Sequence, residues 1–465
     1  MKPTKRLSRR QFLRAGAAAA GVFTIVPRHV LGGPGHLAPS DKVNVAVIGV
    51  GGRGRENVRE LFKVNDCQII AVADPAESFS TANFYYKSTG GRAPAAAEIE
   101  KHYAATTPNH RCAQYEDFRV MLEKEKAIDA ILCATPDHLH AYVSTVAMRA
   151  GKHVYCEKPL THNVWEARRV AQVAKETKVA TQMGNQGHST EGIRQTCELI
   201  WSGAIGPVRE VHAWVGTKRW NPTLTGRPPE TMPVPAGLNW DLWLGPREPR
   251  PFHTAYFPVA WRDFWAFGSS TLGDFGCHDL DSSCWSLDLR APESIEAHAA
   301  GASDKEIGPH GAIVYYEFGP RGDKPAVKIA WYDGGLQPER PAALPNGEAL
   351  PARGVLFVGE KGMMLCGGAG GKPRLLGTGN GTPPTPTLPR SNGHHRDWID
   401  ACKGGKPASS NFEYGARLSE IALLGVLSLR TGRRIQWNAA EMKASGFSGA
   451  DAVIKESYRK GWEVA

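Results

Sequence analysis

The residues best suited to acid–base chemistry are Lys158, in Glu157-Lys158-Pro159, and the pair Asp274 and His278. Pro159 fixes the local turn and disfavours a helical Lys158, whose ammonium can hydrogen-bond a substrate hydroxyl and favour its ionised form. Asp274 and His278 are four residues apart, so they share one face of a helix. A carboxylate that holds an imidazole while the ring exchanges a proton is a general-base arrangement. We therefore predict Lys158, Asp274 and His278 as catalytic and substrate-binding residues.

The same region allows other interpretations. Asp274 could be the N-cap of a helix whose polar groups face solvent. Asp274, His278 and Asp281 could hold a metal, but we predict none because no third His or Glu has a telling spacing. Arg262, between a tryptophan and an aspartate, is a further substrate-binding candidate because its guanidinium can fork onto hydroxyls or a carboxylate. Seven of the thirteen tryptophans lie between Trp214 and Trp285; flat aromatic faces suit sugars, although most should be packing residues.

A nucleotide-binding pattern stands near the start of the chain. An apolar run over residues 43–48 ends in Gly49-x-Gly51-x-x-Gly54, a helix is expected over 56–62, and a second apolar run ends at Asp74. The first glycine permits the tight turn, the second lets the backbone approach a pyrophosphate, and the third allows close helix–strand packing. The helix N-terminus receives the phosphates, and the acid can accept hydrogen bonds from the ribose hydroxyls.

Two more loops follow expected strands and should lie at the same sheet edge. Ala134-Thr-Pro-Asp-His138 follows one strand and Glu157-Lys-Pro159 the next, and ligands of open parallel sheets bind outside the carboxyl ends of the strands. His138 and His140 could instead be solvated loop histidines. The predicted cofactor-binding residues are Gly49, Gly51, Gly52, Arg53, Gly54, Asp74, Thr135, Pro136, His138, Glu157 and Lys158. Because Asp74 would repel a 2′-phosphate, we expect NAD rather than NADP, unless Arg53 or Arg55 contacts that phosphate.

The elements that must position these residues alternate in type. Helices are expected over 118–126, 140–150 and 164–175, and strands over 127–133, 153–156 and 179–183. This alternation predicts an α/β Rossmann domain with a parallel sheet over residues 41–185, in which 76–110 form a long polar insertion. Beyond it, strands over 208–215, 312–318, 326–331 and 354–358, long loops over 219–262 and 333–392 and a final helix over 414–430 predict an α+β domain over 186–465.

Charge and cysteine content narrow the function classes. Residues 1–40 carry seven basic residues and no acidic one, so the formal net charge of +10 falls to +3 for the rest of the chain, which predicts no nucleic-acid partner. Residues 1–38 contain Ser8-Arg9-Arg10-Gln11-Phe12-Leu13 and a short apolar stretch, which resembles a twin-arginine signal and predicts a periplasmic or otherwise exported protein without stable membrane insertion. Cys67, Cys133 and Cys156 should be buried thiols, and we expect no obligatory disulfides.

Taken together, the motifs Gly49-Val-Gly-Gly-Arg-Gly54, Ala134-Thr-Pro-Asp-His138, Glu157-Lys-Pro159 and Gly273-Asp-Phe-Gly-Cys-His278-Asp-Leu-Asp281 resemble the glucose–fructose oxidoreductase / inositol dehydrogenase / MocA family. The resemblance implies a Rossmann domain, then an α+β domain with a large open, mostly antiparallel sheet, and a homodimer or homotetramer built through that sheet. It also implies hydride transfer between a nicotinamide and a hydroxyl-bearing carbon of a sugar or polyol. The family's lysine and Asp-x-x-x-His roles map onto Lys158, Asp274 and His278: His278 takes the hydroxyl proton, Asp274 orients it, and Lys158 stabilises the alkoxide.

Export adds a constraint, because no free NAD pool is expected outside the cytoplasm. An exported enzyme should therefore keep its cofactor and restore it in each cycle. It could couple oxidation of one sugar to reduction of another. Alternatively, it could act as a redox-neutral NAD-dependent glycosidase, lyase or epimerase through a transient keto sugar. Exported relatives of the glycosidase type resemble this chain less at Glu157-Lys158-Pro159, where the lysine is replaced, so we rank the oxidoreductase first. A non-catalytic carbohydrate-binding protein is the third reading, and intact Lys158, Asp274 and His278 argue against it.

Overall fold

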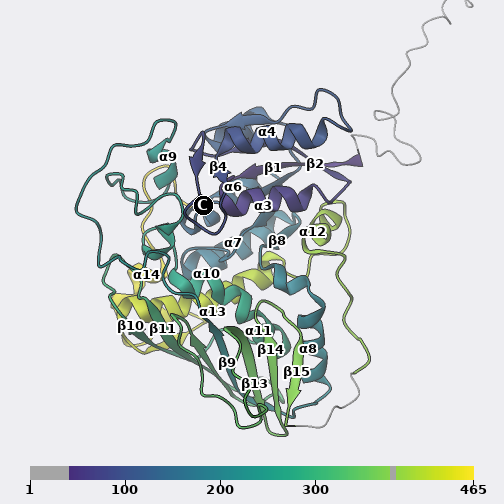
Figure 1. Cartoon of the computed structure of the whole chain (residues 1–465), viewed down its shortest axis with the longest axis vertical. Helices are drawn as coiled ribbons and strands as arrows, with labels where there is room; N and C mark the ends of the chain where they lie inside the picture. The colour runs from purple at the N-terminus through teal and green to yellow at the C-terminus, as the bar shows by residue number, and fades with distance from the viewer. Residues whose placement is uncertain (1–40, 378–383, 465) are drawn as a thin grey trace, which may run out of the picture.

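The computed structural model describes residues 41–377 and 384–464, and the expected signal over 1–38 lies outside them. In the described part of the chain, two large sheets lie at opposite ends of the molecule, with helices between and around them (Figure 1). The first sheet is built from the N-terminal part of the chain and the second from the part after residue 207. This confirms the predicted order of a Rossmann domain followed by an α+β domain.

The first sheet is parallel and has the strand order β5-β2-β1-β6-β7-β8. Its strands are β1 (Val43–Ile48), β2 (Cys67–Ala73), β5 (Ala113–Tyr115), β6 (Ala130–Cys133), β7 (His153–Cys156) and β8 (Thr181–Met183). The helices of this part are α3 (Gly52–Leu61), α4 (Arg92–Tyr103), α5 (Phe118–Lys124), α6 (Asp137–Arg149) and α7 (Val164–Thr177). The order reverses between β1 and β6, so the loops that follow these two strands diverge and leave room for a ligand.

The second sheet has nine strands in the order β15-β14-β13-β9-β12-β11-β10-β16-β17. All of its pairs are antiparallel except β9 with β12. Its strands are β9 (Val208–Val215), β10 (Ser294–Ala300), β11 (Gly311–Phe318), β12 (Val327–Tyr332), β13 (Arg353–Gly359), β14 (Met363–Gly367), β15 (Pro373–Leu376), β16 (Ile435–Asn438) and β17 (Lys443–Ala444).

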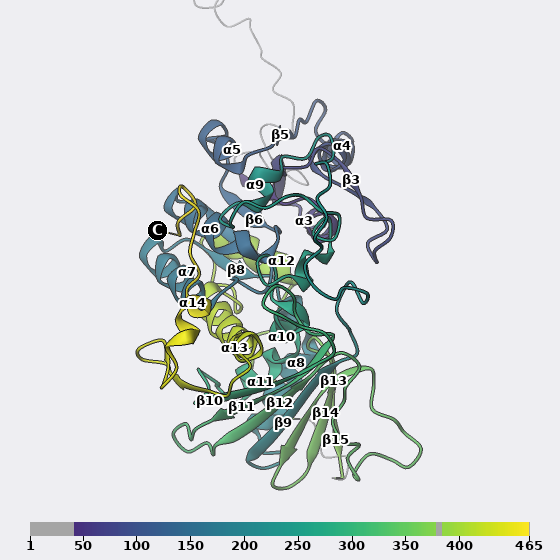
Figure 2. The same ribbon diagram turned by 90° about the vertical axis from the view of Figure 1, so that its left-hand side faces the viewer.

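The remaining helices lie between the sheets or join them. They are η2 (Gln186–Ser189), α8 (Glu191–Trp201), α9 (Trp240–Leu244), η3 (Ala260–Asp263), α10 (Ser270–Asp279), α11 (Asp281–Ser286), α12 (His394–Cys402), α13 (Phe412–Thr431), η4 (Ser448–Ala450) and α14 (Asp451–Ile454). The long helix α13 packs against α7 of the first domain, α10 and β10 (Figure 2). It is buried along much of its length because apolar residues and the small residues Gly and Ser together occupy most of its positions. One apolar core therefore runs from the first domain into the second.

Two segments of the second half of the chain also pack on the first domain. Trp398 and Ile399 of α12 belong to the same apolar cluster as Val45 and Leu61. The segment that carries α9 reaches up beside the Rossmann sheet (Figure 2), and Asn239 N donates to the carbonyl of Pro75 over 2.9 Å. The boundary between residues 185 and 186 thus separates the two large sheets, whereas segments from the second half of the chain pack against the first domain.

Several expected elements differ from the observed ones. Residues 76–110, expected as a long polar insertion, form a hairpin of β3 (Phe79–Ser80) and β4 (Thr89–Gly90) followed by α4. Helix α6 begins at Asp137 rather than at residue 140, since Pro136 holds the extended cap conformation and an acid suits the first turn. The expected loop over 333–392 contains β14 and β15 as well as β13.

Two expectations about the chain as a whole can be compared with the described residues. All nine cysteines are free, and Cys67, Cys133 and Cys156 are buried as predicted. Within residues 41–377 and 384–464, no helix combines the length and the apolar character needed to cross a membrane.

Candidate active site

A cavity of about 570 Å³ opens where the first sheet meets the second domain. Its lining comes from the loops that follow β1, β2, β6 and β7, from η3 and α10, and from the hairpin β3–β4. Lys158, Asp274, His278 and Arg262, which are far apart in the sequence, all line it. The cavity therefore gathers the predicted catalytic and substrate-binding residues at the carboxyl edge of the sheet.

The glycine turn forms one end of this cavity. Gly49 has a φ of +81° and approaches Ala134 so closely that a Cβ would lie 2.7 Å from its carbonyl carbon. A Cβ on Gly54 would lie 1.9 Å from the carbonyl oxygen of Gly49, so only glycine lets α3 start here. Gly51 is the N-cap of α3, and no side chain in the described part of the chain caps that helix. The amides of its first turn are thus available to an anion at the cavity wall.

Asp74 lies where the sequence predicts it, at the end of β2 and on the cavity wall. Its two oxygens accept hydrogen bonds from the amides of Val50 and Ala76, each over 2.9 Å. Burial raises the pKa of this carboxyl to about 6. The carboxylate is therefore held by backbone donors and still has acceptor capacity for a ligand hydroxyl. Arg53 and Arg55, the two arginines that could attract a 2′-phosphate, are paired with Glu157 and Glu98 respectively.

Glu157 is buried and collects three donors on one oxygen. Its Oε1 accepts from Arg53 Nε (3.0 Å), Asn57 Nδ2 (2.9 Å) and Gln186 Nε2 (3.1 Å). Its Oε2 has no hydrogen-bond partner among the described residues. Burial works against ionisation, but the charges of Arg53 and Lys158 outweigh it and hold the pKa of Glu157 at about 2. The group is therefore an anion that fixes Arg53 beside the glycine turn and leaves one oxygen free.

Lys158 makes the main contact between the domains inside the cavity. Its Nζ donates to Oδ1 of Asp274 over 2.5 Å and to the carbonyl oxygen of the same residue over 2.8 Å. The other carboxylate oxygen of Asp274 lies 3.3 Å from Nε of Arg262 and accepts from Nε1 of Trp220 over 3.2 Å. Burial disfavours the charge of Asp274, but Lys158 and Arg262 hold its pKa well below the usual range. Asp274 is thus the shared anion of two cations.

This arrangement corrects the predicted Asp274–His278 pair. The two residues do share one side of α10, but no hydrogen bond joins them in the described structure, because the carboxylate is taken by Lys158, Arg262 and Trp220. Nδ1 of His278 is buried and has no partner among the described residues. Burial, together with the charges of Lys158 and Arg353, holds the pKa of His278 well below 6.5. The ring is therefore neutral at physiological pH and carries a lone pair that can accept a proton.

His138 does not lie on the cavity wall, contrary to the prediction that it contacts the cofactor. Its ring is buried, with Nδ1 3.3 Å from the carbonyl oxygen of Phe267 and Nε2 2.9 Å from that of Trp243. Burial in this apolar setting holds its pKa well below 6.5. The side chain fixes the start of α6 against the second domain. Its neighbours Thr135 and Pro136 do line the cavity, as predicted.

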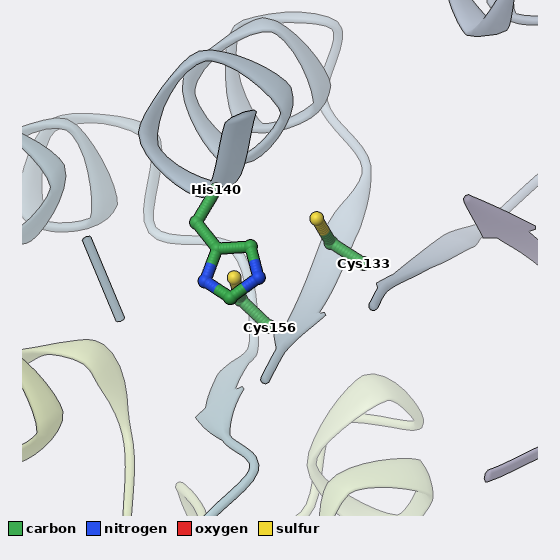
Figure 3. A group of neighbouring side chains, drawn as sticks. All are labelled: Cys133, His140 and Cys156. Atoms are coloured by element: carbon green, nitrogen blue, oxygen red, sulfur yellow. The ribbon is translucent and has the colours of Figure 1, made fainter. Parts of the chain in front are cut away.

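His140 lies on the cavity wall, next to two buried thiols (Figure 3). A ligand atom of His140 and the sulfurs of Cys133 and Cys156 all lie within 4.8 Å of one another. The ring nitrogens face carbonyl oxygens, Nδ1 that of Pro159 (2.7 Å) and Nε2 that of Thr135 (2.9 Å). A metal would need a nitrogen lone pair directed at the sulfurs, so we assign no metal here. The ring instead ties the loop after β6 to the loop after β7.

The alternative metal set of Asp274, His278 and Asp281 does not come together either. Asp281 accepts hydrogen bonds from Nδ1 of His188 (3.0 Å) and from the hydroxyl of Tyr414 (2.5 Å). Asp274, as described above, is the anion of Lys158 and Arg262. The two carboxylates are thus engaged with different partners.

Sequence reasoning missed several wall residues. Arg353 comes from the start of β13 and is fixed by Asp279, and Gln186 comes from η2. Tyr85 and Tyr86 come from the turn of the β3–β4 hairpin. The adjacent tyrosines in a polar segment were the one available signal, whereas nothing local marks Arg353.

The residues on the wall fit a dinucleotide. The turn that a Cβ would block, the uncapped start of α3 and the acid after β2 line the same cavity as the catalytic candidates. Gly49 to Arg53 and Asp74 would hold the phosphate and ribose part, and Thr135, Pro136 and Lys158 would flank the nicotinamide part.

Models of known families match two stretches of the chain. A model described as "Oxidoreductase family, NAD-binding Rossmann fold" matches residues 43–185, and one described as "Oxidoreductase family, C-terminal alpha/beta domain" matches 191–321. The chain belongs to the Gfo/Idh/MocA family. These two stretches contain every residue of the predicted site.

Curated proteins of known name align with part of this chain. A glycosyl hydrolase family 109 protein of Shewanella pealeana is 27% identical over 231 residues, which is 46% of this chain and 47% of that protein. Inositol 2-dehydrogenase of Salmonella typhimurium is 27% identical over 172 residues, 37% of this chain and 45% of that protein. The chain thus spans about half the length of these relatives.

Solved structures share the fold over most of this chain. The WlbA dehydrogenase of Bordetella pertussis, in complex with NADH and UDP-GlcNAcA, superposes with a TM-score of 0.56 at 17% identity and covers 85% of this chain and 99% of its own. The aldose-aldose oxidoreductase of Caulobacter crescentus, complexed with glycerol, gives 0.53 at 16% identity, with 85% and 99% coverage. These likenesses support the two-domain Gfo/Idh/MocA fold.

Proposed function

We propose that this Gfo/Idh/MocA protein is an NAD-dependent oxidoreductase that transfers a hydride between the nicotinamide and a hydroxyl-bearing carbon of a sugar, polyol or sugar derivative. The observation that carries the proposal is the joint placement of Lys158 and His278 in one cavity that begins at the glycine turn. The names of the relatives support the substrate class, since they include an inositol dehydrogenase and an aldose oxidoreductase.

The bound nicotinamide would supply the hydride acceptor or donor. The neutral ring of His278 accepts the proton of the substrate hydroxyl as the alkoxide forms. The ammonium of Lys158, held by Asp274, donates to the developing alkoxide and lowers its energy. Asp274 is a positioning residue in this scheme. Arg262, packed against Trp220 and Trp261, is placed to donate to a further hydroxyl or to a carboxylate of the substrate.

The direct test is turnover with added nucleotide. Purified protein would be given NAD⁺ or NADP⁺ and a panel of monosaccharides, polyols and sugar acids, with reduced nicotinamide followed by absorbance. Reduction of NAD⁺ by a sugar, lost in His278→Ala, is the expected result. Purified protein that neither contains nor binds either nucleotide contradicts the proposal.

We further propose that the protein is exported and retains its cofactor, from the twin-arginine pattern of residues 8–13. Denaturing the purified protein and identifying the released nucleotide tests retention. Near-stoichiometric NAD(H) is expected. If the purified, folded protein contains no nucleotide, the proposed retention of the cofactor is contradicted.

A redox-neutral glycosidase, lyase or epimerase is the second candidate, and the similarity to a glycosyl hydrolase family 109 protein favours it. In such an enzyme, Lys158 and His278 would form and discharge the same alkoxide within one cycle. Analysis of the products distinguishes the oxidoreductase from the redox-neutral enzyme. Net formation of a keto sugar or lactone supports the oxidoreductase, and release of an aglycone or an inverted sugar without net nucleotide reduction supports the alternative.

A further inference from the structure

The hairpin β3–β4 is anchored on the glycine turn. It follows Asp74 directly and pairs Phe79 with Gly90. The ring of Phe79 lies against two glycines, since a Cβ on Gly51 would be 3.3 Å from its Cζ and one on Gly90 would be 2.6 Å away. Larger side chains at these glycines would push the ring away from the turn. The base of the hairpin therefore has a fixed place beside the proposed phosphate site.

The tip of the hairpin begins a stacked row of side chains along the cavity wall. The ring of Tyr86 packs on Gly52, where a Cβ would lie 2.2 Å from its Cδ2. The rings of Tyr86 and Tyr85 are 3.9 Å apart, and the ring of Tyr85 stacks on Trp220 at 5.9 Å and 28°. The guanidinium of Arg262 lies 5.2 Å from the centre of Trp220. All four of these side chains line the cavity, and we call them the stacked row.

The stacked row connects the two domains. Tyr85 and Tyr86 belong to the nucleotide-binding domain, whereas Trp220 and Arg262 belong to the second. Trp220 also donates to Asp274, so the row runs from the glycine turn to the Lys158–Asp274 ion pair. Tyr85 is the weak point of the row, because 59% of its surface is exposed and its contact with Trp220 is a ring–ring contact without a hydrogen bond in the described structure.

We propose that the stacked row is a clasp that closes over a dinucleotide held at the glycine turn. The inference rests on the proposed function, because it assumes that the ligand of the turn is NAD(H). The nucleotide leaves only when Tyr85 separates from Trp220, so release is slow compared with a turn that is open to solvent. The clasp is a device by which the enzyme keeps its cofactor through many cycles. Tyr85 and Tyr86 are then residues of the cofactor site that the nucleotide-binding motif alone does not reveal.

The test measures the rate of nucleotide release. Protein loaded with NADH is mixed with excess NAD⁺ in a stopped-flow instrument, and the fall in bound-NADH fluorescence gives the release rate. We expect Tyr85→Ala to raise this rate about tenfold, which corresponds to about 1.4 kcal/mol and is the size expected for loss of one aromatic pair. Tyr85→Phe keeps the ring and should release NADH at the rate of the unmodified protein. Tyr315→Ala, at an exposed tyrosine of β11, is the matched control and should also leave it unchanged.

The outcomes separate the clasp from the proposed function. Equal release rates in the unmodified protein and folded Tyr85→Ala overturn the clasp while nucleotide binding stands. An increase in Tyr85→Phe as large as that in Tyr85→Ala also overturns it, because the ring is still present. Failure of the unmodified protein to bind NADH overturns the proposed function and the clasp together. Circular dichroism and the melting temperature establish that each variant is folded before its rate is used.

Discussion

Replacing Asp274 with Asn should destabilise the protein more than replacing its partner Lys158 with Met. Asp274 is the shared anion of Lys158 and Arg262, and the side chains of all three are at most 13% exposed. Asp274→Asn removes the carboxylate that pairs with both of these buried cations. Lys158→Met leaves Asp274 with Arg262 at 3.3 Å and with the Trp220 donor. The larger loss of stability expected for Asp274→Asn follows from the number of buried charges that lose their partner in each variant.

The expected losses in the free energy of unfolding follow from the burial of Asp274 and its two cationic partners. Removing one partner of a buried ion pair costs about 3–5 kcal/mol of the free energy of unfolding, and we expect about 3 for Asp274→Asn because Asn keeps the acceptor for Trp220. Lys158→Met loses a hydrogen bond to a charged group, and we expect about 1.5 kcal/mol. The double variant should lose less than the sum of the two single losses, because only Arg262 is then unpaired.

Urea unfolding of nucleotide-free protein measures these differences, followed by circular dichroism and by tryptophan fluorescence so that coincident transitions can be checked. Glu360→Gln is the control, since its ion pair with Arg209 is about half exposed and should contribute less than 1 kcal/mol. A loss in Lys158→Met equal to or larger than that in Asp274→Asn would falsify the reading of Asp274 as the shared anion. Additive losses in the double variant would contradict it as well.

Four further outcomes are expected. Lys158→Met should keep its nucleotide but lose about 10²–10⁴-fold in turnover; near-normal turnover refutes the role of the lysine. Because the pKa of Glu157 is held at about 2, below its usual value near 4.3, its stabilising charge is fully present above pH 5 and is lost as the pH falls toward 2. The free energy of unfolding of the unmodified protein should therefore exceed that of Glu157→Gln by less at pH 3 than at pH 7. A difference that stays constant over this range contradicts the prediction. Because the pKa of His278 lies well below 6.5, the acid limb of turnover should be centred well below that pH, and a limb centred at 6.5 argues against this base. Gly54→Ala should prevent correct folding, since its Cβ would lie 1.9 Å from a backbone oxygen; soluble yield and melting temperature check this, with Gly226→Ala, whose Cβ meets only a side-chain atom at 3.4 Å, as the control.

The first domain could be predicted from the sequence because its signals are local. Strand β7 occurs at His153–Cys156 as expected, since a short apolar run between turn residues specifies a buried strand. The role of Gly54 also follows from a steric limit that acts within a few residues, because its Cβ would meet the carbonyl oxygen of Gly49. These features depend little on the rest of the fold.

The partner of Asp274 could not be predicted in this way. Spacing along α10 places Asp274 and His278 on one side of the helix, but the choice between His278 and Lys158 depends on how the two domains meet. His138 shows the same limit. Its loop position predicts a ligand contact, whereas in the tertiary fold its ring is buried between the carbonyl oxygens of Phe267 and Trp243. The tyrosines of the β3–β4 hairpin become part of the cavity only through packing on Gly52.

The buried helix α13 explains why residues from two domains can hold one geometry. Its Ser419 hydroxyl lies 3.0 Å from the amide of Leu160, two residues after Lys158, and 3.6 Å from the sulfur of Cys277 on α10. One side chain thus touches both the loop that carries the lysine and the helix that carries Asp274 and His278. Because α13 also packs on α7 and β10, a relative shift of the two domains would have to disturb the common core. The Lys158–Asp274 contact is therefore set by the core beneath it and does not depend on a ligand to bring the two groups together.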